Sequence, residues 1–357
     1  MKTRLIGLLL LSMTLMVNAQ TNAPIAPPFS TEEGLIERYE TDIKAFWEQG
    51  RFSSFTGVDN IDIQYAEFVS ESNKQCIVLV PGRTEGYLKY KELSFDLVNQ
   101  GFNLFIIDHR GQGLSGKMLS NPEKGYVELF DHYSDDLHYF VDNIVQSACD
   151  NEIFLLAHSM GGAISARYLQ RYVTPIKAAM LASPMIAINS GGIPNWLAEF
   201  IIASGDNLAA LLGKESWYFL GQGDYSATPF ADNALMQSSV RYQIFTDLYA
   251  NEKALQLGGV TYHWLSEAIA VNKAIFSDIS KLKVPTQVMQ AGADTVVDNQ
   301  AQDDFCAQLH QANPNSCPAG KPLVIENARH EIFFELDKMR IPGIEATLAW
   351  FKQHSEK

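Results

Sequence analysis

Residues 153–162 read Ile-Phe-Leu-Leu-Ala-His-Ser-Met-Gly-Gly, and this stretch decides the fold. The five apolar residues suit a strand that is buried on both faces, and the small residues after Ser159 suit a tight turn into a helix. A serine at such a junction is expected in the pattern G-x-S-x-G, because small neighbours avoid clashes at the strained turn. Ala157 stands here in place of the first glycine. We predict that Ser159 is a nucleophile at the end of a buried strand.

Further short apolar runs lie on both sides of this stretch, and each ends at turn or polar residues. They occupy residues 76–80, 102–107, 178–181, 286–290 and 323–325. Helical patterns separate several of them, at 90–99, 134–145 and 161–172. Buried strands that alternate with helices predict an α/β fold with a mostly parallel central sheet and helices on both faces.

The chain before residue 76 shows two other patterns. Apolar residues recur at helical spacing over 31–47, which predicts a helix. Residues 61–68 alternate between apolar and polar, which predicts a half-buried antiparallel strand.

One long segment breaks the alternation of strands and helices. Residues 186–276 show helical patterns without strand-like runs, and they include Trp196, Trp217 and Trp264. We predict a helical cap inserted between two strands of a core that comprises residues 20–185 and 277–357. The alternative is that the apolar residues of this segment form only its own core.

A serine hydroxyl needs a neighbouring base to act as a nucleophile at neutral pH. When the serine follows a strand in this way, the expected order along the chain is serine, acid, histidine. Of the eight histidines, His330 is the one that follows a late strand, and we predict that it is the general base. His158 adjoins Ser159, but neighbouring side chains in such a turn diverge, so we assign it a structural role.

The acid is expected just after the strand at 286–290, where a carboxylate can hold the imidazole in the required tautomer. Asp294 and Asp298 are the candidates. Asp298 precedes a helix predicted to begin at Asn299, which suits a helix cap. We therefore favour Asp294 as the third catalytic residue.

Acyl transfer through a serine also needs backbone N–H groups that stabilise the oxyanion. We assign one to Met160, which begins a helix, and the other to Arg83, in the loop after residues 76–80. The alternative for Arg83 is an ordinary surface residue or one that contacts a substrate carboxylate. The glycine-rich stretch 108–116 lacks the placement of a phosphate loop, and no spacing of ligand residues indicates a metal, so we expect no cofactor.

The N-terminus has the pattern of a secretory signal peptide. Lys2 and Arg4 precede an apolar run over 5–17, and Ala19 is a small residue at the expected cleavage position. We predict removal of residues 1–19 and export to the periplasm or out of the cell. The alternative is an uncleaved membrane anchor, although the run is short for a bilayer.

The net charge of −14 argues against a nucleic-acid partner and against strongly anionic bilayers. We keep transient contact with a membrane surface as an expectation.

An even number of cysteines in an exported chain indicates disulfides. We favour the pairs Cys306–Cys317 and Cys76–Cys149, with free buried thiols as the alternative for the second pair.

Taken together, the motifs resemble the monoacylglycerol lipase and lysophospholipase branch of the α/β-hydrolases, its bacterial lysophospholipases above all. The motifs that carry the resemblance are Pro81-Gly82, residues 108–116, His158-Ser159-Met160-Gly161-Gly162, Gly292-Ala293-Asp294, His330-Glu331 and the segments 239–242, 257–265 and 328–335. Many relatives have His-Gly in place of Pro81-Gly82, which bears on the assignment of Arg83. The resemblance covers nearly all of the chain after residue 19. It implies the α/β-hydrolase fold and Ser159, Asp294 and His330 as the triad.

The resemblance also implies a small amphiphilic substrate, a lysophospholipid or a monoacylglycerol. Other activities fit the same residues: cleavage of short esters, thioesters or peptides, and transfer of the acyl group to another lipid instead of water. A non-catalytic lipid-binding protein is a further alternative, and an intact serine, acid and histidine in the expected order argue against it.

Overall fold

The computed structural model describes residues 29–189, 192 and 194–356, so the predicted signal peptide lies outside the described residues. Eight strands in this part of the chain form one sheet, in the order β1-β2-β4-β3-β5-β6-β7-β8. β2 pairs antiparallel with β1 and β4, and the other pairs are parallel. The mostly parallel sheet is therefore confirmed. The strands are β1 (Arg51–Thr56), β2 (Asp62–Phe68), β3 (Gln75–Val80), β4 (Phe102–Ile107), β5 (Ile153–His158), β6 (Ile176–Ala182), β7 (Thr286–Ala291) and β8 (Leu323–Ile325).

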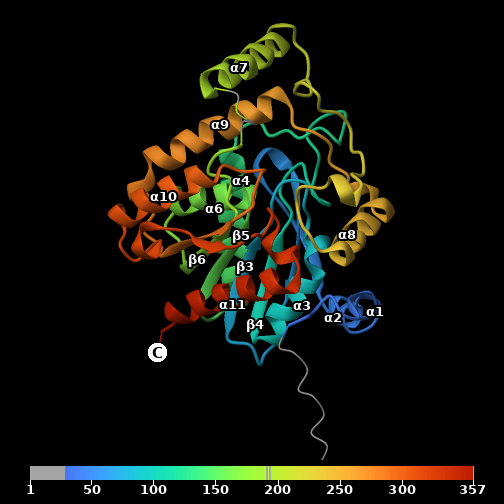
Figure 1. Cartoon of the computed structure of the whole chain (residues 1–357), viewed down its shortest axis with the longest axis vertical. Coiled ribbons are helices and arrows are strands. Elements are labelled where there is room, and N and C mark those ends of the chain that lie inside the picture. Colours follow the sequence, from blue (N-terminus) through green and yellow to red (C-terminus); the bar gives the residue numbers. More distant parts are fainter. Residues whose placement is uncertain (1–28, 190–191, 193, 357) are drawn as a thin grey trace, which may run out of the picture.

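Helices cover both faces of the sheet (Figure 1). In β3, Val78 and Val80 belong to one hydrophobic cluster, whereas Ile77 and Leu79 belong to a second cluster on the opposite face. Because successive side chains of a strand point to opposite faces, burial on both faces explains the unbroken apolar runs. Outside residues 186–276, the helices are α1 (Leu35–Glu40), α2 (Asp42–Trp47), α3 (Lys91–Asn99), α4 (Asp131–Phe140), α5 (Gln146–Ala148), α6 (Met160–Arg171), α10 (Asn299–Ala312) and α11 (Asp337–Gln353).

Local structure differs from the expectation near the N-terminus. The helix expected over 31–47 is broken at Thr41, whose φ of −118° and ψ of −98° are not helical, so α1 and α2 are separate. The antiparallel strand expected at 61–68 is present as β2. β1 was not predicted, because Phe55 is its only buried residue and the strand lies at an edge of the sheet.

The chain between β6 and β7 is helical where the structure describes it. It contains α7 (Asn195–Leu211), α8 (Ser239–Asn251) and α9 (Tyr262–Ser277), together with short 3₁₀ turns. α9 packs on α6 of the core, and α7 packs on α9. Figure 1 shows α7 as the outermost element of this stack, with α8 on another side of the molecule. We call residues 186–276 the cap segment.

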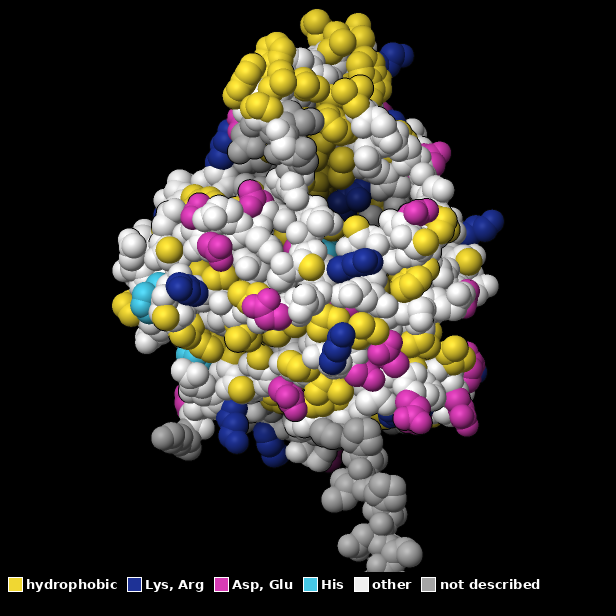
Figure 2. Space-filling model, in the orientation of Figure 1, with side chains coloured by type: hydrophobic (Ala, Val, Ile, Leu, Met, Phe, Trp, Pro, Cys, Tyr) yellow, Lys and Arg dark blue, Asp and Glu magenta, His cyan; other side chains and the backbone are white. Residues whose placement is uncertain are grey.

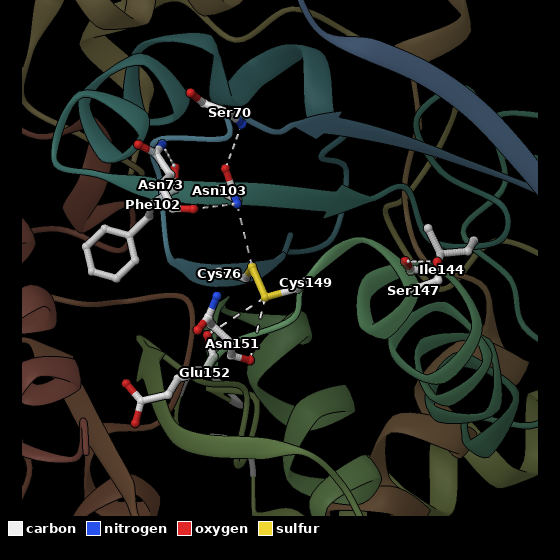
Figure 3. The surroundings of a disulfide bond; sticks show 10 residues. All are labelled: Ser70, Asn73, Cys76, Phe102, Asn103, Ile144, Ser147, Cys149, Asn151 and Glu152. Atoms are coloured by element: carbon white, nitrogen blue, oxygen red, sulfur yellow. Dashed lines mark hydrogen bonds between the residues drawn. A yellow bond between two sulfur atoms is a disulfide. The ribbon is translucent and has the colours of Figure 1, made fainter. Parts of the chain in front are cut away.

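The favoured disulfide pairs are both present. Cys76–Cys149 joins the start of β3 to the turn before β5, with a Cα–Cα distance of 6.4 Å. Figure 3 shows this bond between Asn103 on one side and the residues Asn151 and Glu152 on the other. Cys306–Cys317 joins α10 to the loop before β8, with a Cα–Cα distance of 5.3 Å. The first bond thus lies at the amino ends of two central strands.

Candidate active site

Ser159 occupies the sharp turn between β5 and α6. Its φ of 53° and ψ of −118° are strained for a residue with a side chain. Gly161 allows the turn to pack against the loop after β3, because a Cβ there would lie 2.2 Å from the carbonyl oxygen of Val80. Ala157 lies in β5 within the hydrophobic core, so its methyl group is accommodated.

His330 and Asp294 reach Ser159 from the ends of two other strands. Nε2 of His330 lies 2.8 Å from Oγ of Ser159, and its Nδ1 lies 2.7 Å from Oδ2 of Asp294. Ser159 is 8% exposed and His330 is 4% exposed, so the contacts are shielded from water. The structure therefore brings together the three side chains that the sequence singled out, in one continuous line of hydrogen bonds.

Asp294 is held in its ionised form. Burial raises the pKa of its carboxyl, but the hydrogen bond and the charge of His330 outweigh burial and lower the pKa overall. The N–H groups of Val296 and Val297 also donate to Oδ1. Asp298 instead accepts the N–H groups of the first turn of α10, as a helix cap does.

The loop after β3 lies against Ser159. A Cβ on Gly82 would lie 3.1 Å from Cβ of Ser159. The N–H of Gly82 donates to Glu85, and the N–H of Thr84 donates to Gln112 over 3.1 Å. Between them, the N–H of Arg83 has no acceptor among the described residues. Met160 begins α6, and first-turn N–H groups have no partner within a helix.

The glycine-rich stretch 108–116 supports this loop. Oδ1 and Oδ2 of Asp108 accept the N–H groups of Tyr87 and Leu114, over 2.5 and 2.8 Å. Gln112 donates to the carbonyl oxygen of Gly82 over 3.0 Å. The stretch therefore positions the loop beside Ser159.

Glu85 connects three parts of the site. Its Oε2 accepts hydrogen bonds from the N–H of Gly82, from the hydroxyl of Tyr90 over 2.5 Å and from Nδ1 of His158 over 3.1 Å. Nζ of Lys89 lies 2.7 Å from Oε1. Burial raises the pKa of Glu85, but the charges of Lys89 and His158 outweigh it and lower the pKa well below its ordinary value.

The same cluster reaches His330. Nε2 of His158 donates to the carbonyl oxygen of His330 over 3.2 Å, and Lys89 also pairs with Glu331, the next residue along the chain. We call Glu85, Lys89, Tyr90, His158 and Glu331 the Glu85 cluster. Sequence reasoning assigned His158 a structural role and missed the other members, although Glu85 and Glu331 each lie near a predicted site residue.

A mainly apolar cavity of about 370 Å³ lies within the cap segment, because all the residues that line it fall between 186 and 276. Its walls come from the loop after β6 and from α7 and α9, through Ile186, Ile188, Ile202, Leu265, Ile269 and Phe276. The N–H of Met185, the residue before Ile186, donates to the carbonyl oxygen of Ser159 over 2.9 Å. Figure 2 shows a hollow below α7 with a mainly hydrophobic visible wall and a Lys or Arg side chain in it.

Similarity to known proteins extends over most of the chain. The family model described as "Serine aminopeptidase, S33" matches residues 71–337. Lysophospholipase L2 of Escherichia coli (strain K12) is 39% identical over 311 residues, which cover 87% of this chain and 90% of that protein. A probable lysophospholipase L2 of Haemophilus influenzae is 29% identical and covers 84% of this chain and 91% of its own length.

Solved structures show the same fold at lower identity. A soluble variant of monoglyceride lipase from Saccharomyces cerevisiae has a TM-score of 0.65 at 20% identity, and covers 86% of this chain and 95% of that chain. Monoacylglycerol lipase of Paleococcus ferrophilus has a TM-score of 0.61 at 18% identity, and covers 82% and 99%.

Proposed function

Because the chain belongs to the serine aminopeptidase S33 family and has the α/β-hydrolase fold, we propose that it is a serine hydrolase that cleaves carboxylic esters of lipids. Ser159 is the nucleophile, His330 the general base and Asp294 the residue that orients the imidazole. The observation that carries the proposal is the continuous hydrogen-bonded line from Oγ of Ser159 to the carboxylate of Asp294.

The reaction proceeds through an acyl-enzyme. Oγ of Ser159 attacks the ester carbonyl while Nε2 of His330 takes its proton, and the ionised Asp294 stabilises the imidazolium. His330 then protonates the leaving alcohol, and a water molecule attacks the acyl-enzyme by the reverse proton transfers. The N–H groups of Arg83 and Met160 bind the oxyanion, and one such donor lowers the barrier by about 3 kcal/mol.

The substrate is a lipid with one acyl chain, a lysophospholipid or a monoacylglycerol. The mainly apolar cavity of the cap segment supports this choice, because an acyl chain needs apolar walls. The named relatives, lysophospholipase L2 and monoglyceride lipase, support it as well. The family description also names an aminopeptidase, so peptide cleavage on the same triad is the second candidate.

A serine substitution tests the nucleophile. The variant Ser159→Ala should lose both ester hydrolysis and covalent labelling by a fluorophosphonate. Ser165→Ala is the matched control, because Ser165 is a buried serine of α6 whose hydroxyl has no partner, and this variant should keep both. Labelling of Ser159→Ala would contradict the assignment.

A substrate panel tests the lipid. Lysophospholipid, 1-acylglycerol, short nitrophenyl esters and aminoacyl amides should be compared on the purified enzyme by kcat/KM. Greater turnover of the aminoacyl amides would favour the peptidase candidate. Formation of diacyl lipid from lysophospholipid alone would reveal acyl transfer to a second lipid.

We further propose that the outer face of α7 makes transient contact with a lipid surface. Trp196, Phe200 and Leu211 share one face of the helix and are 71%, 67% and 83% exposed. Figure 2 shows hydrophobic side chains gathered over α7. No helix among the described residues is long and apolar enough to cross a membrane. Contact at the surface is the mode that this patch supports.

Vesicle binding tests the surface contact. The double variant Trp196→Ser/Phe200→Ser should bind less to zwitterionic vesicles and hydrolyse vesicle-borne lipid more slowly, with unchanged turnover of a soluble short ester. Val173→Ser is the control, because Val173 is 97% exposed but lies outside α7, between α6 and β6. Equal binding by all of these proteins would contradict the contact.

We also propose that the protein is exported and acts in the periplasm or outside the cell. The signal pattern over residues 1–19 and the two disulfides support export, because disulfides persist in oxidising compartments. Protein purified from the periplasmic fraction should begin at residue 20. A chain that starts at residue 1 and stays in the cytoplasm would contradict this.

A further inference from the structure

Arg83 extends its side chain from the loop beside Ser159 to the cap segment. Nη2 donates to the carbonyl oxygen of Gly258 over 2.5 Å, and Cζ lies 5.4 Å from the ring centroid of Trp264 in α9. Nη2 also lies close to Gly125, where a Cβ would be only 2.6 Å away. The guanidinium therefore lies between the core and the cap segment, and Arg83 as a whole is partly buried.

This guanidinium has no counter-ion in the described part of the chain. Its Nε is enclosed without any partner, and no carboxylate there lies within ion-pair distance of Arg83. Burial lowers the pKa of Arg83 to about 10, and the groups that act against burial are the phenols of Tyr133 and Tyr218 rather than acids.

The arginines with buried side chains elsewhere in the structure are all paired. Each contacts at least one carboxylate, in the pairs Arg110–Asp136, Arg167–Asp131, Arg241–Glu92 and Arg340–Asp96. Such pairing is the rule, because a desolvated cation is costly unless an anion compensates it. Arg83, which is partly buried in the loop beside Ser159, has no such carboxylate partner among the described residues.

We propose that the Arg83 guanidinium binds the phosphodiester of a lysophospholipid, so that the enzyme selects phosphate-bearing monoacyl lipids over neutral monoacylglycerols. The inference rests on the proposed lipid-ester hydrolysis. The planar guanidinium matches phosphate oxygens with two parallel hydrogen bonds.

The chemistry of the substrate places its phosphate close to this side chain. In a 1-acyl lysophospholipid, three glycerol carbons separate the ester oxygen from the phosphate oxygen. The backbone N–H of Arg83 faces the ester carbonyl in the proposed mechanism, and its side chain starts from the same residue. One residue therefore contacts the reacting carbonyl and the phosphate of the same molecule.

A matched pair of lipids tests the proposal. Wild type, Arg83→Gln and Arg83→Lys are compared on 1-palmitoyl-lysophosphatidylglycerol and 1-palmitoylglycerol, each in the same neutral detergent micelles. In Arg83→Gln, kcat/KM for the lysophospholipid should fall about 10- to 100-fold, the loss expected for a charge-assisted bidentate contact. For 1-palmitoylglycerol it should fall less than about threefold, and Arg83→Lys should be intermediate on the lysophospholipid.

Arg329→Gln is the control. Arg329 is also close to the site, because it precedes His330 in the chain. Like Arg83, it donates a guanidinium hydrogen bond to a carbonyl oxygen, from Nη1 to Asn233. This variant should leave the ratio of the two kcat/KM values unchanged. Equal losses on both lipids in Arg83→Gln, or an unchanged ratio, would overturn the inference while leaving lipid hydrolysis intact. A wild-type enzyme that cleaves neither lipid would instead refute the proposed function.

Discussion

Nζ of Lys89 lies 2.7 Å from Oε1 of Glu331, the residue that follows His330. Both side chains are buried, and Lys89 also pairs with Glu85, which accepts the N–H of Gly82 beside Ser159. A single ammonium thus connects the loop that carries His330 to the loop proposed to bind the oxyanion.

Removal of Lys89 should destabilise the fold. In Lys89→Met, two buried carboxylates lose their cation, and breaking a buried pair in this way costs about 3–5 kcal/mol. The free energy of unfolding in urea measures the loss. Lys177→Met, which removes the exposed pair with Glu356, should produce no measurable change, because exposed pairs contribute little. Equal effects of the two substitutions would contradict the buried cluster.

Stability should depend on pH through His158. Burial lowers the pKa of His158, but the charge and hydrogen bond of Glu85 outweigh burial and raise it above 6.5. The stabilisation that protonated His158 gains from Glu85 is therefore fully present below pH 6.5. It is lost as the pH rises through the raised pKa of His158 in the folded state. Urea midpoints between about pH 6 and pH 9 should fall more steeply for wild type than for His158→Gln. Parallel pH curves would contradict this.

The two candidate acids should respond differently to substitution. Asp294→Asn keeps the shape of the side chain but favours the wrong tautomer of His330, so kcat should fall about 10⁴-fold. Asp298→Ala removes the cap of α10, which should cost about 1 kcal/mol of stability with little change in kcat. A large loss of kcat in Asp298→Ala alone would reverse the assignment.

The disulfides should differ in their contribution to stability. Cys76–Cys149 closes a sequence separation of 73 residues and Cys306–Cys317 one of 11. From the entropy of loop closure, we expect the first bond to stabilise the fold by about 4 kcal/mol and the second by about 3 kcal/mol. Double serine variants of each pair, compared by urea unfolding, measure the difference. A larger loss from the shorter loop would show that another effect dominates.

The central strands could be predicted because each is buried on both faces, which leaves an unbroken apolar run such as that of β5. β1 could not, because Phe55 is its only buried residue and nothing else in Arg51–Thr56 marks a strand. The break at Thr41 was missed for a related reason, since the apolar spacing continues through it.

The three site residues that come directly after strands could be predicted from the sequence. Ser159, Asp294 and His330 each come after a strand of the same parallel sheet, and such ends meet at one edge. The Glu85 cluster could not be predicted, because Lys89 and Glu331 are 242 positions apart. The lack of a counter-ion at Arg83 could not be predicted either, because the sequence does not show which charged side chains form ion pairs.

The Cys76–Cys149 bond sits at the far end of the two strands whose other ends lead to the Arg83 loop and to Ser159. The bond therefore affects the stability of the fold and does not contact any reacting atom. A thiol reductant should inactivate the enzyme slowly through unfolding, while the molecules that remain folded keep their full turnover.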